Sequence, residues 1–182
     1  MTMRVFAAIK PPPSIIRKLV LLQKGVEDAR WSDPDKLHIT LGFFGDVANE
    51  KIEILDYELV QHGRTGFDVA LSGAGHFGNK EPHAIWIGVD MSKDLRGLYK
   101  HCRRAARHAK IEMESRKFMP HVTLAYLKDG TPHAHIIAFE KRLSRFNCAP
   151  FLVDEMLLFS SHRKARGGNL YRMEASYPMI VS

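Results

Sequence analysis

Hydrophobic and polar positions follow two different periods along the chain, and both helices and strands are expected from them. Apolar residues that recur every three or four positions predict amphipathic helices, and short apolar or alternating runs bounded by turn residues predict strands. Helices are expected at residues 15–26, 49–60 and 93–110. Strands are expected at residues 4–10, 37–45, 67–73, 83–91, 118–127, 151–159 and 170–179. Ser14 is positioned to cap the first helix, and residues 161–169 form a polar, Gly-containing loop.

Two of these strands carry a similar pattern. In residues 37–45, Ile39, Leu41 and Phe43 alternate with His38, Thr40 and Gly42, which predicts one apolar face that includes Phe43. In residues 118–127, Val122 and Leu124 oppose His121 and Thr123 in the same way. Since residues two apart in a strand share a face, each segment presents an imidazole beside a hydroxyl.

The two His-x-Thr-Leu strings lie 83 positions apart, from His38 to His121, at similar places in each half of the chain. Chance would supply only about 0.3 His-x-Thr triplets in a chain with this many His and Thr residues. A single copy would more often be structural, but a pair suggests a duplicated unit. A pseudo-twofold axis would then place the two motifs across a cleft from each other.

A cleft with two imidazoles suits in-line displacement at phosphorus. One imidazole accepts a proton from the attacking oxygen while the other donates a proton to the leaving oxygen, and the ordinary imidazole pKa of about 6.5 makes both roles available. We therefore take His38 and His121 as candidate catalytic residues. Thr40 and Thr123 are candidate phosphate-binding residues, because their hydroxyls can donate to the non-bridging oxygens. No Cys/His or paired-carboxylate pattern predicts a metal site, and no cofactor is expected.

Composition and charge bear on the expected binding partner and cellular location of the protein. The chain has 182 residues, a net charge of +7 and a pI near 9.5, which favours a polyanionic partner such as RNA without establishing one. A basic row on the helix at 93–110 is read as a solvated face by default. Two cysteines, no signal peptide and no long apolar run predict a cytoplasmic protein without membrane association. A monomer is expected.

At these residues the sequence resembles the two-histidine phosphoesterase superfamily, and within it the RNA 2',3'-cyclic phosphodiesterases historically called 2'-5' RNA ligases. The segments that carry the resemblance include RWSDPDKLHITLGFFGDV, FMPHVTLAYL and DEMLLFSSH. It implies an α+β class and a single bilobal domain over residues 1–182. The bilobal, duplicated, pseudo-twofold fold would have two antiparallel sheets backed by helices and a central cleft.

The resemblance also implies an activity, which is hydrolysis of RNA or oligonucleotide 2',3'-cyclic phosphate ends to a 2'-phosphate, with 2'-5' RNA ligation in some members. By analogy, His38 would protonate the departing 3' oxygen and His121 would activate water. The partner would be an RNA or oligonucleotide terminus. Two alternatives stay open: a nucleotide-binding module without catalysis, and a phosphodiesterase for a small cyclic-phosphate nucleotide.

The sequence departs from the family pattern at two positions. Many relatives carry a basic residue five positions after the second His, where this chain has Tyr126, and often a Lys four after the first, where it has Gly42. Candidate replacements for a phosphate contact are Arg116, Lys117 and Arg166. Three aromatic residues could stack on a base but are expected in the core by default. They are Phe6, Phe44 and Phe77.

Overall fold

The structure is a computed structural model, and it describes residues 1–163 and 168–181. It is an α+β protein with an eight-stranded antiparallel sheet and a small two-stranded antiparallel sheet. The helices are α1 (Pro13–Leu22), the 3-10 helix η1 (Pro34–Lys36), α2 (Asn49–Val60), α3 (Lys93–His108) and α4 (His133–Leu143). The strands are β1 (Thr2–Ile9), β2 (Arg30–Trp31), β3 (Ile39–Ala48), β4 (Phe67–Val69), β5 (Leu71–Phe77), β6 (Ala84–Val89), β7 (His121–Tyr126), β8 (Phe151–Val153), β9 (Glu155–Arg163) and β10 (Asn169–Pro178).

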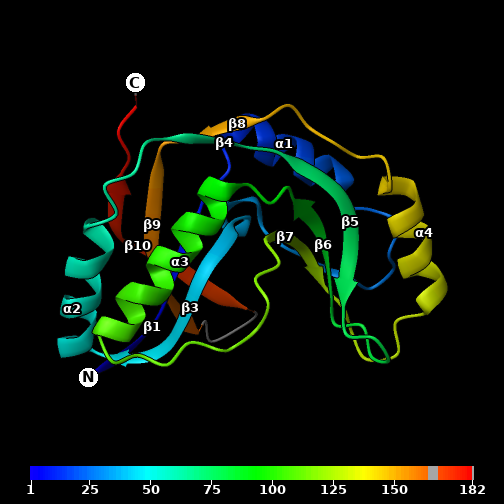
Figure 1. The fold of residues 1–182 in the computed structure, drawn as a ribbon. Coiled ribbons are helices and arrows are strands. Elements are labelled where there is room, and N and C mark those ends of the chain that lie inside the picture. The colour runs from blue at the N-terminus through cyan, green and yellow to red at the C-terminus, as the bar shows by residue number, and fades with distance from the viewer. Residues whose placement is uncertain (164–167, 182) are drawn as a thin grey trace.

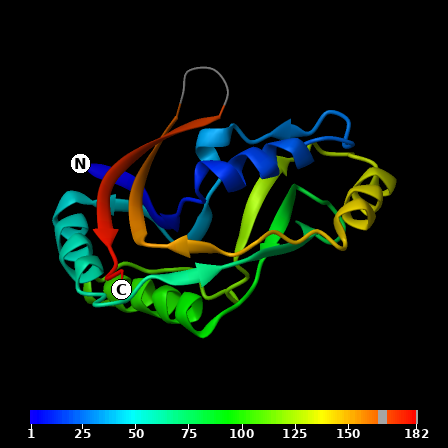
Figure 2. The same cartoon turned by 90° about the horizontal axis from the view of Figure 1, so that it is seen from above.

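The large sheet consists of two halves that meet at its middle. Its strand order is β10-β9-β1-β3-β7-β6-β5, with β2 added beside β7. The halves join between β3 and β7 through one registered pair, Ile39 and Val122. Figure 1 and Figure 2 show α2 and α3 outside the half that contains β1 and β3, and α1 and α4 outside the half that contains β5 and β6. Two helix-backed halves therefore flank a middle line, in agreement with the expected α+β fold.

A second connection between the halves is the two-stranded sheet. Strands β4 and β8 pair antiparallel, with Asp68 opposite Leu152. Ala70 alone separates β4 from β5, and Asp154 alone separates β8 from β9, and both β5 and β9 belong to the main sheet. The continuous strands predicted at 67–73 and 151–159 were therefore wrong in this respect, because the chain leaves one sheet and enters the other within each of them.

The first helix differs from its expected form at both ends. It stops at Leu22 instead of Val26, although Val26 is still buried. Gly25 has a φ of +85°, which a continuing helix cannot contain. At the other end Pro12 occupies the N-cap position and Pro13 begins the helix, so Ser14 is not the cap. A proline suits the first helical position because its missing N–H would have had no intrahelical partner there.

The alternation expected in β3 breaks at Phe43. The ladder between β1 and β3 shifts register twice, leaving Leu41 and Phe44 as extra residues on β3. Such bulges change the face to which the following side chains point. Phe43 is consequently 49% exposed, whereas Phe44 is buried in the core. The prediction that Phe43 shares the apolar face of Ile39 was wrong.

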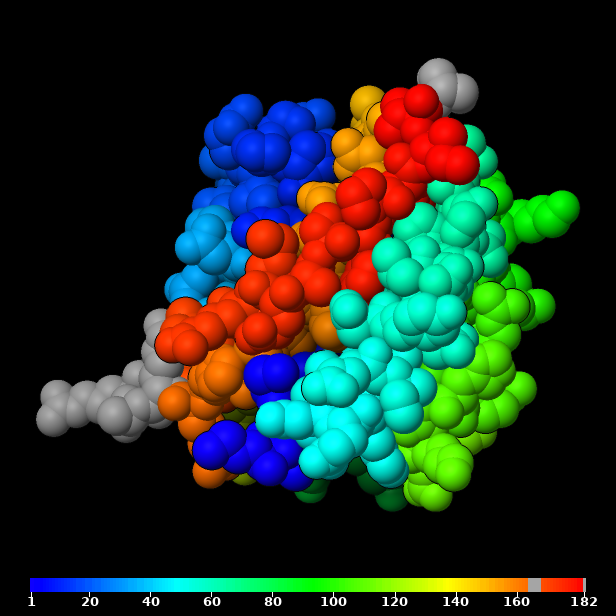
Figure 3. All heavy atoms as spheres, turned by 90° about the vertical axis from the view of Figure 1, so that its left-hand side faces the viewer, coloured from blue at the N-terminus to red at the C-terminus, as the bar shows by residue number. Residues whose placement is uncertain are grey.

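Helix α2 and strand β10 close one side of the molecule, where Figure 3 shows them next to each other. The hydroxyl of Tyr177 on β10 donates a hydrogen bond of 2.6 Å to Asp56 on α2. Helices α2 and α3 coincide closely with their predicted ranges. The loop predicted at 161–169 falls partly on residues 164–167, which lie outside the described residues, as does Arg166. None of the helices in the described part of the chain has the length and apolar character that a bilayer span requires.

Candidate active site

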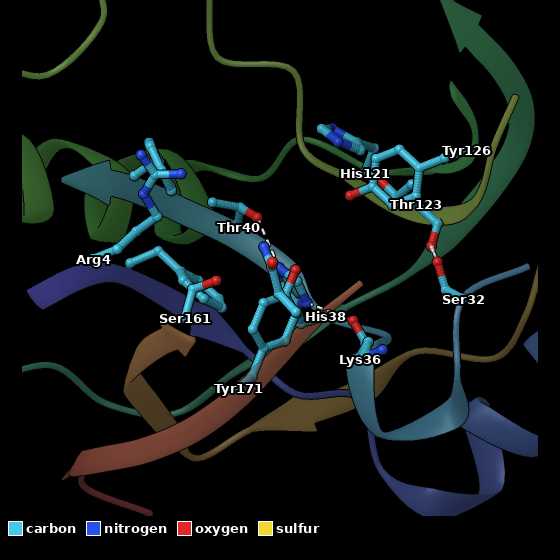
Figure 4. A pocket seen from close by; sticks show the side chains of 13 residues that line it. Arg4, Ser32, Lys36, His38, Thr40, His121, Thr123, Tyr126, Ser161 and Tyr171 are labelled. Atoms are coloured by element: carbon cyan, nitrogen blue, oxygen red, sulfur yellow. Dashed lines mark hydrogen bonds between the residues drawn. The ribbon is translucent and has the colours of Figure 1, made fainter. Parts of the chain in front are cut away.

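A cavity of about 340 Å³ opens where the two halves of the large sheet meet (Figure 4). It brings together all four residues singled out in the sequence, His38, Thr40, His121 and Thr123. The remaining lining residues are Arg4, Phe6, Ser32, Lys36, Phe43, Tyr126, Ser161, Asn169 and Tyr171. In both motifs the His and the Thr are half-buried and the residue between them is fully buried. The two strands therefore turn their polar faces into one space and their apolar faces into the core.

His38 is held by its own chain segment. Its Nδ1 lies 2.6 Å from the carbonyl oxygen of Lys36, the last residue of η1. Because a carbonyl only accepts, Nδ1 must carry the hydrogen. Nε2 is then the acceptor in the neutral ring, and it lies 3.1 Å from the hydroxyl of Thr40. The ring thus presents Nε2 to the cavity beside the hydroxyl of its own motif.

His121 repeats this arrangement on β7. Its Nδ1 lies 2.7 Å from the carbonyl oxygen of Met119, again two residues earlier in the chain. The same reasoning places the hydrogen on Nδ1 and leaves Nε2 as the acceptor. The hydroxyl of Ser32 fixes the backbone around Thr123, because it donates a hydrogen bond of 3.1 Å to the Thr123 carbonyl oxygen. Both imidazoles therefore have the same tautomer, set by the backbone.

Aromatic rings pack against both imidazoles. The ring centroid of Phe6 lies 5.0 Å from that of His38, and the ring centroid of Phe77 lies 4.7 Å from that of His121. Tyr171 meets His38 edge-on at 5.6 Å. Phe6 is buried but lines the cavity, and Phe44 belongs to the core, as expected. Phe77 is only partly buried, so the expectation that it lies in the core was wrong. These rings restrict the rotation of the imidazoles and remove water from them.

This burial alters the acid–base properties of the site. Loss of hydration lowers the pKa of His38 to about 4, with further lowering from His121 and Lys10 and a partial offset from the Lys36 carbonyl. Burial also lowers the pKa of His121, against a partial offset from the Met119 carbonyl. Both rings are therefore neutral in the free protein at pH 7. The ordinary imidazole pKa assumed from the sequence therefore does not apply to either ring.

The basic residues near the cavity are not the ones expected from the sequence. A neighbouring cavity of about 470 Å³ shares Ser32, Lys36, Tyr126 and others with the first, and it adds Arg30. The Arg30 guanidinium lies 5.1 Å from the centre of the Tyr126 ring. Arg116 and Lys117 line neither cavity, so the structure does not support them as replacements for the phosphate contact.

Gly42 also faces away from the cavity. A Cβ atom at this position would lie 3.0 Å from the Cε of Met113 and 3.3 Å from the ring of Phe44. The bulges in β3 account for this orientation, since they turn Phe43 rather than residue 42 toward the open space. The absence of a lysine at Gly42 therefore removes no cation from the cavity of this chain.

Several site residues escaped the sequence reasoning. Tyr171 and Ser161 come from β10 and β9, whose position beside β1 depends on long-range strand pairing. Arg4 enters from β1 and pairs with Asp46 at 2.8 Å, and Lys36 pairs with Asp33 at 2.6 Å. Ser161 and Lys36 lie in segments that carry the family resemblance, but no role was predicted for any of these residues from the sequence, and the folded sheet places them in the site.

The arrangement offers two neutral Nε2 atoms and two hydroxyls in one partly dehydrated space, with cations at its edge. Such a set can bind an anionic phosphorus centre and move protons on both sides of it. Among the described residues, no three His, Cys, Asp or Glu side chains gather in a way that could hold a metal ion.

Comparison with known proteins gives consistent matches. The family model described as the 2'-5' RNA ligase superfamily matches residues 11–165. An RNA 2',3'-cyclic phosphodiesterase of Thermotoga maritima is 32% identical over 136 residues, which cover 69% of this chain and 71% of the relative. One from Archaeoglobus fulgidus is 29% identical over 134 residues, covering 71% and 76%. The crystal structure of Escherichia coli LigT complexed with 3'-AMP has a TM-score of 0.80 at 25% identity, covering 98% of this chain and 99% of that one.

Proposed function

This chain belongs to the 2'-5' RNA ligase superfamily, and on that basis we propose that it hydrolyses the 2',3'-cyclic phosphate at the end of an RNA or oligonucleotide to a 2'-phosphate. One observation carries the proposal: both His-x-Thr motifs point an imidazole Nε2 and a hydroxyl into the same cavity. We further propose that residues 1–182 act as a single bilobal unit, as a monomer in the cytoplasm, without a metal or other cofactor.

In the proposed reaction, His121 and His38 act on opposite sides of the phosphorus atom. Nε2 of His121 accepts a proton from water as the water oxygen bonds to phosphorus. The bond between phosphorus and the 3' oxygen breaks, and Nε2–H of His38 gives its proton to that oxygen. The products are a 2'-phosphate and a free 3'-hydroxyl. The two assignments follow the family analogy and are interchangeable by the symmetry of the site.

The acid must gain its proton when the substrate binds. The low pKa of free His38 means that the ring is neutral before binding. An anionic cyclic phosphate at hydrogen-bonding distance favours the imidazolium form and raises this pKa. Thr40, whose hydroxyl lies 3.1 Å from Nε2 of His38, is then released to donate to a phosphate oxygen. Thr123 has the equivalent role in the second motif.

The cavity beside the site favours an oligonucleotide over a mononucleotide. It continues from the first cavity past Tyr126 and carries Arg30 and Lys36 on its wall. We propose that it takes the nucleotide that precedes the cyclic end, with its phosphate near Arg30. In this chain Arg30 and Tyr126 together would fill the place of the basic residue that relatives carry five positions after the second His.

Ligation uses the same groups in the proposed scheme. If a 5'-hydroxyl replaces water, His121 accepts its proton, the bond to the 3' oxygen breaks, and the product is a 2'-5' linkage. The test is to incubate an oligonucleotide that ends in 2',3'-cyclic phosphate with the protein and a chelator, and to identify the products. A 2'-phosphate is the expected product.

The same assay separates the alternatives. Saturable nucleotide binding without any turnover would favour a binding module over an enzyme. Hydrolysis of small cyclic nucleotides that is not inhibited by oligonucleotides would favour the small-molecule phosphodiesterase. Loss of turnover in the chelator would contradict a metal-independent reaction.

A further inference from the structure

A third hollow of about 390 Å³ lies outside the cleft, between α3 and the segment that joins α3 to β7. Five of its lining residues are basic and none is acidic. Arg96, Lys100 and Arg103 share one face of α3, since they are four and seven positions apart. Arg116 and Lys117 come from the connecting segment. The fold therefore gathers cations from two separate stretches of chain.

A pair of aromatic rings fixes this arrangement. Tyr99 of α3 and Phe118 of the connecting segment stack with centroids 4.0 Å apart and planes 4° from parallel. Arg103 is held over Tyr99, 5.9 Å from its ring centre, and its guanidinium donates to the Tyr99 hydroxyl at 3.3 Å. The stack packs the connecting segment against the helix, and both rings line the hollow beside the basic side chains.

The positive charge of this hollow is largely uncompensated. Arg116 pairs with Glu114 at 2.7 Å. Within the described residues, Arg96, Lys100 and Lys117 form no ion pair. Like charges four positions apart on a helix, such as Arg96 and Lys100, destabilise it by a few tenths of a kcal/mol. Packing Arg116 and Lys117 beside the helix adds two further cations to the same hollow.

The connecting segment leads into β7, whose residues His121 and Thr123 line the cleft. Phe118 is three residues before His121, and Met119, whose carbonyl orients the His121 ring, lies between them. Figure 1 shows the connecting segment running from the end of α3 past β3 to the start of β7. The hollow shares no lining residue with either cavity of the cleft, so a bound strand would have to cross the surface between them.

We propose that the hollow bounded by Arg96, Lys100, Arg103, Arg116 and Lys117 is a second RNA-binding site, outside the cleft, which holds the backbone of a single strand. Cationic grooves with aromatic rings bind single strands without sequence preference, through phosphates and partial stacking. The site rests on the proposed function for the choice of RNA as its ligand, but its binding of RNA does not require catalysis.

The test removes three of the unpaired cations in one variant, Arg96→Ala/Lys100→Ala/Lys117→Ala. The matched control removes three exposed cations of α1 and its C-terminal end, Arg17→Ala/Lys18→Ala/Lys24→Ala, so that the net charge changes equally. Binding of a labelled 12-nucleotide RNA with a 3'-hydroxyl is measured by fluorescence anisotropy at several salt concentrations. Hydrolysis is measured on a mononucleotide and on a 12-nucleotide 2',3'-cyclic phosphate.

The hollow variant is expected to bind the 12-nucleotide RNA about 10-fold more weakly, with a salt dependence reduced by about 2 in log–log slope, roughly 0.7 for each lost phosphate contact. Its mononucleotide hydrolysis is expected to stay within about 2-fold of the wild type, while KM rises for the long substrate. Equal weakening in the control, or undiminished binding in the hollow variant, would overturn the proposal. So would binding to anionic lipid vesicles without binding to RNA.

The two proposals fail in different ways. If no cyclic phosphate is hydrolysed, the proposed function fails, yet the anisotropy difference between the hollow variant and its control still decides whether RNA binds here. If hydrolysis proceeds but long and short substrates respond identically to the three substitutions, the second RNA site fails alone.

Discussion

Ile39 of β3 and Val122 of β7 are paired across the middle of the large sheet, and each is the central residue of its His-x-Thr motif. Both side chains are fully buried. Because the strands run antiparallel, this pairing places the histidine end of each motif toward the threonine end of the other. The pair therefore lies at the pseudo-twofold centre of the site and fixes the two motifs relative to each other.

Shortening Ile39 should weaken this centre. Ile39→Ala removes buried methyl groups from a fully packed position and is expected to lower the free energy of unfolding by about 2–5 kcal/mol. Ile54→Ala, at a position on α2 that is 47% exposed, is the matched control and should cost much less. Urea denaturation of both variants measures the difference, and equal losses would contradict the packing at Ile39.

Removing either imidazole should abolish most of the proposed catalysis. We expect His38→Ala and His121→Ala each to lower kcat by about 10²- to 10⁴-fold, because each removes one proton transfer. The double variant should be little worse than the single ones, since the two groups act as a unit. His108→Ala, which removes an exposed imidazole paired with Glu58, should retain activity. Rates are measured on a cyclic-phosphate oligonucleotide, and an active His38→Ala variant would contradict the assignment.

The threonine hydroxyls should matter more than the threonine methyl groups. Thr40→Val keeps the shape of the side chain but loses the donor, and a decrease in kcat of about 10²-fold is expected if that donor stabilises the transition state. Thr40→Ser keeps the hydroxyl and should stay within about 10-fold of the wild type. The same pair of substitutions at Thr123 is expected to give the same order. Similar losses for Val and Ser at one position would point to packing instead of hydrogen bonding.

How far the sequence could predict this site depends on whether a residue's position is set locally. The His-x-Thr pairs were predictable because strand alternation alone places an imidazole and a hydroxyl on one face. The orientation of Phe43 was not, since it depends on bulges that appear only when β3 pairs with β1. Tyr171 reaches His38 from the far end of the chain, through the pairing of β10 with β9 and of β9 with β1. The lowered pKa of His38 likewise depends on burial by distant residues.

Arg30 should affect the KM of a longer substrate more than that of a mononucleotide. Arg30→Ala is expected to raise KM about 10-fold for a dinucleotide that ends in cyclic phosphate, because it loses one charged contact to the preceding phosphate. Hydrolysis of a mononucleotide cyclic phosphate should change little. Tyr126→Phe keeps the ring beneath the guanidinium and serves as the control for stacking. A loss shared equally by the mononucleotide and the dinucleotide would place Arg30 at the reacting phosphate instead.

The pH dependence should reveal the burial of the two imidazoles. The proposed mechanism requires one ring protonated and the other neutral, so kcat/KM is expected to be bell-shaped, with its maximum midway between the two pKa values of the free protein. The pKa of His38 is about 4 and that of His121 is below its ordinary value, so the maximum is expected at about pH 5 or lower. A bound phosphate anion stabilises the protonated ring, so the maximum of kcat should lie at higher pH than that of kcat/KM.

Initial rates from pH 4 to 9, with circular dichroism to confirm folding at each pH, measure both profiles. A kcat/KM maximum above pH 7 would show that the free imidazoles are not dehydrated as the packing of Phe6 and Phe77 requires.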